Sequence, residues 1–129
     1  MSWEEYISKN LMAPLNSEGV TLTSAAILGL DGSIWAHSAS FPEFKGDEWH
    51  KAFAALNDTS TAVYIQGDKY IKTTADGTRL HARKDKLGFI IRKTNMAVIM
   101  GFYTEPDVDA RVCSKVIESL GDYLENQGY

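Results

Sequence analysis

The stretch TAVYIQGDKYIKTTADGTRLHARKDKLGFIIRKTNMAVIMGFY, residues 61–103, decides the fold of this 129-residue chain. Five short runs rich in β-branched and aromatic residues follow one another in it, and glycine, aspartate or asparagine stands in each gap between them. Such runs with turn residues between them are typical of β-strands. Because the connections are short, neighbouring strands must run antiparallel. The predicted strands span residues 61–66, 69–75, 78–83, 88–93 and 96–103.

A β-hairpin is predicted before these strands. In residues 24–40, SAAILGLDGSIWAHSAS, the pair Asp31-Gly32 separates two strand-like runs and is a strong signal for a two-residue turn. Residues 46–56, GDEWHKAFAAL, predict a short helix that begins after a cap at Asp47. Three apolar residues recur there at helical spacing, namely Trp49, Phe53 and Leu56. With the five later strands, the hairpin gives a meander of about seven strands.

A helix is also predicted at each end of the chain. Ser2 and Glu5 have the spacing of a capping box, which starts a helix that ends at about Leu11 or Met12. The last helix begins near Val108 and carries an apolar stripe at four-residue spacing. The stripe consists of Val112, Val116, Leu120 and Leu124, with Cys113 and Ile117 beside it.

The order of these elements predicts an α+β fold in a single domain of residues 1–129, with helices packed on a central antiparallel sheet. The two terminal helices are expected to share one face of the sheet, because each has an apolar stripe and no other surface to bury it on. Gly121 lies inside the last helix, where glycine costs about 1 kcal/mol relative to alanine. It indicates a close approach by another element, and the first helix is the candidate.

The composition indicates a globular protein of the cell interior. The chain is 44% hydrophobic and 23% charged, and it has no apolar run long enough to cross a membrane. Its start lacks the basic-then-apolar pattern of a signal peptide. The single cysteine, Cys113, cannot form an internal disulfide and fits a reducing compartment. The expected location is therefore the cytoplasm.

The net charge of −4 hides a strongly basic stretch of the sequence. Between Lys69 and Lys93 there are eight basic residues and two acidic ones, Asp76 and Asp85, which gives a local charge of about +6. Two interpretations stay open at this point. The stretch is either a set of solvated strand faces and turns or an electrostatic docking surface for an acidic partner.

The sequence carries no recognisable catalytic or metal-binding motif. The three histidines, His37, His50 and His81, fall on different predicted elements and at no metal-ligand spacing. Cys113 lies on the apolar side of the last helix, where a thiol is usually an inert part of the core. There is no phosphate-binding glycine loop and no nucleophile elbow. We therefore predict neither enzymatic activity nor a bound cofactor or metal.

Four segments of the chain resemble the profilin family. They are MSWEEYISKNLM at the start, AAILGLDGSIWAHSASFPEF at residues 25–44, IRKTNMAVIMGFYTEP at residues 91–106 and LGDYLENQGY at the end. The resemblance covers nearly the whole chain in order, and the motifs are most similar to the profilins of plants and amoebae. It implies a central antiparallel sheet with the terminal helices together on one face and smaller helices on the other.

The resemblance also implies three ligands: monomeric actin, proline-rich partners such as formin-type nucleators, and acidic phosphoinositides at a membrane surface. A profilin of this kind regulates actin polymerisation in the cytoplasm and is associated with the cytoskeleton. It is expected to be a monomer and to bind no nucleic acid. In the family, aromatic residues of the terminal helices form a shallow groove for polyproline. The matching positions are Trp3, Tyr6, Trp35, Tyr123, Leu124 and Tyr129.

Two further sites are implied by position. The actin-binding residues are Lys69, Arg83, Lys84, Val108, Asp109 and Lys115. The phosphoinositide site is the densest basic cluster in the chain, Arg83, Lys84 and Lys86. Because these two sites overlap, lipid and actin are expected to compete. One departure from the family is the segment ARKDKLG, residues 82–88, where many relatives have a glycine-rich basic turn and Asp85 lowers the local charge.

Two rival interpretations belong to other classes of protein. The first is a small sheet-and-helix scaffold that dimerises through its sheet and binds no polyproline. A scaffold of this kind does not require aromatic residues at both termini and beside the turn between them. The second is a small-molecule-binding or enzymatic domain, which needs a deep pocket with converging polar groups that the sequence does not indicate. Binding of a proline-rich ligand separates the profilin interpretation from both.

Overall fold

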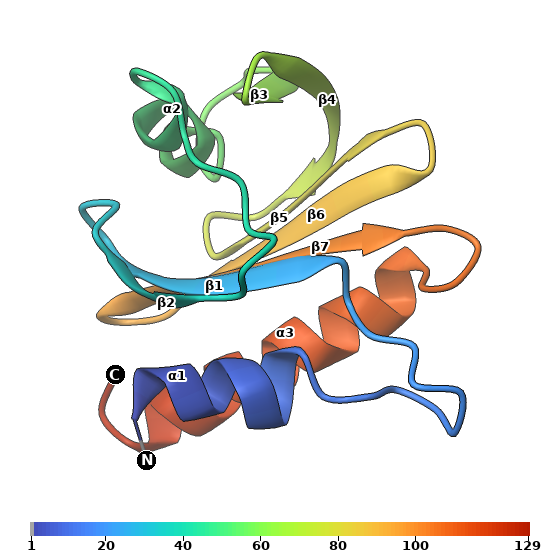
Figure 1. Ribbon diagram of the computed structural model, residues 1–129. Helices are drawn as coiled ribbons and strands as arrows, with labels where there is room; N and C mark the ends of the chain where they lie inside the picture. The colour runs from blue at the N-terminus through green and yellow to red at the C-terminus, as the bar shows by residue number, and fades with distance from the viewer. Residues whose placement is uncertain (1) are drawn as a thin grey trace.

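The computed structural model describes residues 2–129, so Met1 of the predicted domain lies outside the described residues. It contains a seven-stranded antiparallel sheet with helices on both faces (Figure 1), which confirms the predicted α+β fold. The helical elements are α1 (Trp3–Tyr6), η1 (Ile7–Leu11), α2 (Glu48–Ala54) and α3 (Ala110–Asn126). The strands are β1 (Ser24–Gly29), β2 (Ile34–His37), β3 (Ala62–Ile65), β4 (Asp68–Ala75), β5 (Arg79–Lys84), β6 (Leu87–Lys93) and β7 (Ala97–Thr104).

The strand order across the sheet is β2-β1-β7-β6-β5-β4-β3. The five later strands follow chain order, as their short connections predict. The prediction of a meander through all seven strands is wrong at one place, because β1 pairs with β7 and places Ser24 opposite Phe102. The segment that carries α2 therefore connects one edge of the sheet to the other. The two edge strands, β2 and β3, have four residues each.

Two of the turns differ slightly from those predicted. The turn between β3 and β4 is formed by Gln66 and Gly67, whose φ angles of 52° and 81° suit a tight hairpin turn. In the first hairpin the loop spans four residues, 30–33, and not only the predicted pair Asp31-Gly32. Gly32 has a φ of 90°, a conformation that favours glycine. The turn signals were therefore placed correctly to within one or two residues.

Each face of the sheet has its own hydrophobic core. One core contains Trp49 of α2 together with Phe89 and Ile91 of β6. The other core contains Ile90, which lies between those two residues on β6, and Ile117 of α3. The division follows from the alternation of side chains along a strand. Both terminal helices lie on one face and α2 on the other (Figure 1), which confirms the predicted arrangement.

The N-terminal helix begins with the predicted capping box. The Ser2 hydroxyl accepts a hydrogen bond from the Glu5 N–H, and the Glu5 carboxylate accepts one from the Ser2 N–H, both at 3.3 Å. α1 continues directly into η1, a five-residue π-helix that ends at Leu11. Ile7 and Leu11 are the buried residues of η1, as their four-residue spacing predicts.

The buried stripe of α3 differs from the predicted one. Val112 is 40% exposed and Val116 is only partly buried. Residues four apart on a helix are rotated by about 40° relative to one another, because a helix has 3.6 residues per turn. From Val112 to Leu124 this rotation accumulates to about 120°, so a strict four-residue repeat leaves the core. The buried side chains instead alternate spacings of four and three residues: Cys113, Ile117, Leu120 and Leu124.

Gly121 is approached by a side chain of the sheet and not, as predicted, by the first helix. A Cβ atom on Gly121 would lie 2.8 Å from Cγ of Arg92, a residue of β6. Arg92 is 5% exposed and donates to three carboxylates of α3: Glu118 at 3.0 Å, Asp122 at 3.1 Å and Glu125 at 2.5 Å. The missing side chain at Gly121 therefore leaves room for the arginine to reach the acidic side of α3.

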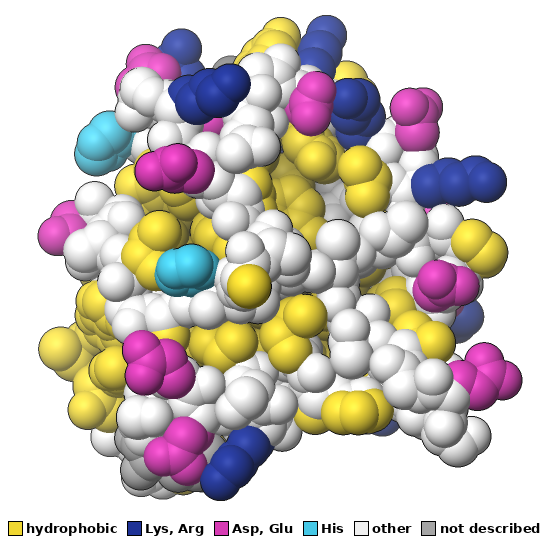
Figure 2. All heavy atoms as spheres, viewed as in Figure 1, with side chains coloured by type: hydrophobic (Ala, Val, Ile, Leu, Met, Phe, Trp, Pro, Cys, Tyr) yellow, Lys and Arg dark blue, Asp and Glu magenta, His cyan; other side chains and the backbone are white. Residues whose placement is uncertain are grey.

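The basic stretch between Lys69 and Lys93 is largely neutralised within the folded chain. Five of its eight basic residues form ion pairs with carboxylates, namely Lys72, Arg79, Arg83, Lys84 and Arg92. Lys93 lies over the ring of Phe53 with its Nζ 5.6 Å from the ring centroid. On the face shown in Figure 2, basic and acidic side chains are interspersed. The stretch is therefore mainly a source of intramolecular ion pairs.

Candidate functional site

Five aromatic side chains meet where the two ends of the chain come together. Trp3 is at the centre, with ring centroids 4.9 Å from Trp35, 5.0 Å from Tyr129 and 5.6 Å from Tyr6. The Tyr6 ring lies 6.0 Å from that of Tyr123 on α3. These distances are typical of interacting aromatic pairs. The fold therefore brings aromatic residues from α1, β2 and the C-terminal end together, in what we call the aromatic cluster.

The aromatic cluster faces solvent in part. Tyr123 is 46% and Tyr129 is 38% exposed, and Trp3, Tyr6 and Trp35 are only partly buried against the core beneath. A group of exposed large apolar side chains is unusual on a monomeric protein unless it binds something. Tryptophan and tyrosine suit such a surface because each combines an apolar ring with a polar tip. The cluster is therefore the candidate ligand site.

Two residues predicted to contact ligands are buried. Leu124, the sixth predicted member of the polyproline site, is 1% exposed. It belongs to the buried stripe of α3, so its side chain supports the aromatic cluster from below and does not reach the surface. Val108, predicted to contact actin, is 2% exposed and packs in the same core. The sequence did not show which way these two side chains point.

The position of Tyr129 is fixed by a contact that the sequence did not indicate. Its main-chain oxygen accepts hydrogen bonds from the Thr94 hydroxyl at 2.9 Å and from the Met96 N–H at 2.6 Å. Both donors lie in the turn between β6 and β7. The Tyr129 N–H donates to the Leu124 carbonyl at 2.9 Å. These three hydrogen bonds hold the last ring of the cluster against Trp3.

Four of the six residues predicted to contact actin lie on the α3 side of the sheet. Lys69 on β4 is adjacent to Tyr70, and Arg83 on β5 is adjacent to Ala82. Tyr70 and Ala82 belong to the core on the α2 side, so Lys69 and Arg83 point to the α3 side. Asp109 is the N-cap of α3 and accepts a hydrogen bond from the Val112 N–H at 3.0 Å. Lys115 is exposed on the flank of the same helix. These four residues could meet one partner.

Lys84 points to the opposite face. Because adjacent residues of a strand alternate, Lys84 lies on the α2 side and pairs with Asp68 at 3.0 Å, whereas Arg83 pairs with Glu105. The predicted phosphoinositide cluster is therefore divided between two faces, and two of its three charges already have acidic partners. Lys86, the third member, lies in the exposed turn between β5 and β6.

Two of the residues considered for chemistry, His81 and Cys113, are partly or fully buried. His81 places Nε2 2.6 Å from the Tyr103 hydroxyl and Nδ1 2.8 Å from the Thr73 hydroxyl, and burial followed by the charge of Arg83 lowers its pKa. Burial raises the pKa of Cys113 to about 12, so the thiol is protonated and unreactive at neutral pH. Within residues 2–129, no cluster of histidine, cysteine and carboxylate side chains is placed to bind a metal, and no helix has the length and apolarity to span a membrane.

The sheet, the paired terminal helices and the surface aromatic cluster define a small domain with a candidate binding surface of exposed rings. The family model described as Profilin matches residues 1–129, and the chain belongs to the profilin family. Profilin II of Acanthamoeba castellanii is 32% identical, with a TM-score of 0.83 over 99% of this chain and 100% of that chain. The profilin of Schizosaccharomyces pombe is 29% identical, with a TM-score of 0.81 over the same shares.

Two more distant profilin structures contain a bound partner and share the fold. Mouse profilin IIa, in complex with a double repeat from the FH1 domain of mDia1, is 16% identical with a TM-score of 0.72 over 100% of both chains. LokiProfilin2, in complex with rabbit actin, is 18% identical with a TM-score of 0.66 over 81% of this chain and 85% of that chain. At this level of identity the likeness concerns the fold.

Proposed function

We propose that this protein binds proline-rich segments through the aromatic cluster and monomeric actin through the α3 side of β4 and β5, and that it thereby regulates actin polymerisation. The observation that carries the proposal is the packing of Trp3 against three other surface aromatic rings. Membership of the profilin family supports both activities. The FH1 complex of one relative and the actin complex of another support them further.

The chemistry of the cluster suits a polyproline II helix. This helix has three residues per turn and no internal hydrogen bonds, so its carbonyl groups are free to accept. Proline rings pack against aromatic rings, while the indole N–H and tyrosine O–H groups donate to the carbonyls. Burial, and then the neighbouring Tyr123, raise the pKa of Tyr6, so its hydroxyl stays protonated and can donate at neutral pH. A rigid ligand also loses little entropy on binding.

Titration with a proline decamer, followed by tryptophan fluorescence, tests this function directly. Trp3 and Trp35 lie in the aromatic cluster, whereas the third tryptophan, Trp49, is 6% exposed in the opposite core. A change in emission therefore reports on the cluster. A saturable change supports the proposal. An unchanged spectrum and no heat of binding by calorimetry would reject it and favour a scaffold that uses the same fold without a proline ligand.

The Lys115→Glu variant is expected to bind monomeric actin about tenfold more weakly and to bind the proline decamer as the parent does. Lys115 is exposed on α3, and reversing a charge at the edge of an interface turns an attraction into a repulsion. Lys9→Glu is the matched control, since Lys9 is an exposed helical lysine whose partner is Glu5 at 3.1 Å. Sedimentation of actin assembly mixtures measures the affinity for actin, and calorimetry measures the affinity for the proline decamer. Parallel loss of both activities in a folded Lys115→Glu variant would contradict the two-surface arrangement.

We propose that acidic phosphoinositides bind near the turn between β5 and β6 and compete with actin. Basic side chains near an anionic membrane contribute about 1 kcal/mol each, and salt screens this attraction. Because Arg83 and Lys84 have acidic partners, Lys86→Ser is expected to cause most of the loss seen on changing all three to serine. Co-sedimentation with phosphoinositide vesicles at low and high salt measures this. Undiminished binding of the triple variant would place the lipid site elsewhere.

The remaining features of the proposal concern the class and state of the protein. We propose a monomeric binding protein of the cytoplasm and cytoskeleton, without enzymatic activity. The net charge of −4 and the pairing of most of the basic stretch do not favour binding of nucleic acid, whose phosphates require a concentrated positive surface.

A further inference from the structure

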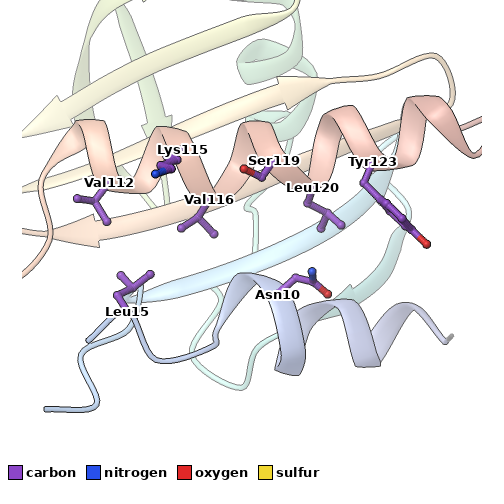
Figure 3. Close-up of a pocket in the computed structure, with 8 residues that line it drawn as sticks. All are labelled: Asn10, Leu15, Val112, Lys115, Val116, Ser119, Leu120 and Tyr123. Carbon is purple, nitrogen blue, oxygen red and sulfur yellow. The ribbon is translucent and has the colours of Figure 1, made fainter. Parts of the chain in front are cut away.

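A hollow of about 550 Å³ lies between α3 and the segment that includes η1 and the chain after it. Val112, Val116 and Tyr123 project from α3 toward Asn10 and Leu15 on the facing segment (Figure 3). Four of the residues that line the hollow are aliphatic, namely Leu15, Val112, Val116 and Leu120, and the others are Asn10, Lys115, Ser119 and Tyr123. We call it the aliphatic hollow.

The aliphatic hollow exists because part of the apolar stripe of α3 turns away from the core. Leu120 is 3% exposed, whereas Val112, two turns earlier, is 40% exposed. The rotation of about 40° per four residues turns Val116 to the edge of the core and Val112 out of it, and both side chains line the hollow. Val112 is thus exposed and Val116 only partly buried against the core, and both lie on one side of the helix, where further burial by a ligand would be favourable.

The aliphatic hollow continues the aromatic cluster along the same two elements. Tyr123 belongs to both, since its ring contacts Tyr6 and its side chain also lines the hollow. On the facing segment, Asn10 follows Tyr6 by one helical turn. On α3, Val112 precedes Tyr123 by eleven residues, a distance of about 16 Å along the helix axis. An extended chain that rises about 3.1 Å per residue covers this distance with about five residues.

The side chains change from aromatic in the cluster to partly aliphatic in the hollow, so the two parts suit different residues of a ligand. The aromatic cluster offers flat rings, which suit proline, whereas the hollow beyond Tyr123 offers branched aliphatic side chains with three polar residues among them, Asn10, Lys115 and Ser119. We propose that the aliphatic hollow binds about five residues that flank the proline tract of the same ligand on one side, through their aliphatic side chains. The inference rests on the proposed binding of polyproline by the aromatic cluster.

Five peptides test the proposal by calorimetry: a proline decamer, the decamer with Leu-Val-Ala-Leu-Val at its N-terminus or at its C-terminus, and the decamer with five serines at either end. One of the two aliphatic extensions is expected to increase affinity about tenfold over the decamer, and the serine extensions are expected to leave it unchanged. The double variant Val112→Ser with Val116→Ser is expected to lose this gain and to bind the decamer as the parent does. Leu87→Ser, which removes an aliphatic side chain of similar exposure (36%) elsewhere, should keep the gain.

The outcomes separate this proposal from the function on which it rests. Equal affinity for all five peptides, or a gain that survives the double valine variant, overturns the aliphatic hollow as a flanking site and leaves the aromatic cluster intact. Failure of the parent to bind any of the peptides rejects the polyproline function and this proposal together. Sedimentation of the same samples provides a further check, because self-association that the valine changes abolish would assign the hollow to a second copy of the chain and overturn the proposal.

Discussion

The Trp3→Ala variant is expected to bind a proline decamer at least about 30-fold more weakly than the parent, which corresponds to ~2 kcal/mol. Trp3 is the central ring of the aromatic cluster, with three other rings at centroid distances of 4.9 Å, 5.0 Å and 5.6 Å. Its removal takes away one of the two tryptophan rings of the cluster and leaves the neighbouring rings without their common support. Calorimetry measures the change without relying on the fluorescence that the substitution alters.

Two further variants make this prediction specific. Tyr64→Ala is the matched control, because Tyr64 is an exposed aromatic residue (47%) on the edge strand β3 and outside the cluster. It should bind the decamer as the parent does. Tyr123→Ala removes an exposed ring (46%) of the cluster itself, so it should weaken binding without unfolding the protein. Full affinity in folded Trp3→Ala and Tyr123→Ala variants would show that polyproline does not bind at the aromatic cluster.

The Arg92→Ala variant is expected to lower the free energy of unfolding by about 3 kcal/mol. The Arg92 side chain is 6% exposed, and its removal leaves Glu118, which is 19% exposed, without its main buried partner. Breaking a buried ion pair from one side typically costs 3–5 kcal/mol. The lower end of that range applies because Asp122 and Glu125 are 67% and 39% exposed and can be solvated. Urea unfolding followed by circular dichroism measures the difference.

Arg79→Ala is the matched control for this measurement. Arg79 pairs with the same carboxylate, Glu118, at 2.5 Å, but its side chain is 51% exposed. An exposed ion pair contributes at most about 1 kcal/mol, so this variant should be destabilised far less. Equal losses in the two variants would mean that the burial of Arg92 does not contribute to stability. Neither change should affect binding of the decamer, since both residues lie outside the aromatic cluster.

Local patterns were sufficient to predict most of the elements. The capping box of Ser2 and Glu5 marks the start of the first helix through two hydrogen bonds between residues three apart. The five later strands were found because alternating side chains and turn residues lie within a few positions of one another. The buried stripe of α3 was misplaced at Val112 and Val116, because a four-residue repeat was followed where a helix of 3.6 residues per turn requires alternating spacings.

Features that depend on distant residues could not be predicted. The pairing of β1 with β7 joins the first strand of the chain to the last, and no local signal marks it. In the sequence, nothing distinguishes Arg92 from any other charged residue near the end of a strand. Its carboxylate partners lie 26 to 33 residues further along the chain. The hydrogen bond between Thr94 and Tyr129 spans 35 residues and is equally invisible in the sequence.

The candidate site was predicted in part. The resemblance to profilins named six residues for the predicted polyproline site, and the five aromatic ones meet in the structure. The resemblance gave positions and not directions, so it included the buried side chains of Leu124 and Val108. It also grouped Arg83 with Lys84, although neighbouring residues on a strand point to opposite faces. A prediction that combined the resemblance with strand alternation would have separated these two.

The short edge strands of the sheet affect whether this protein can associate with itself while it binds its proposed partner. An open sheet can pair with a strand of another molecule along either edge, because its edge strands carry unpaired N–H and C=O groups. Here each edge offers a strand of only four residues, β2 and β3, and the pairing of β2 with β1 is interrupted by an irregularity next to Ile27. A strand of another molecule would gain few hydrogen bonds at either edge. The short edges thus disfavour self-association through the sheet, as the proposed binding of a polymerising partner requires.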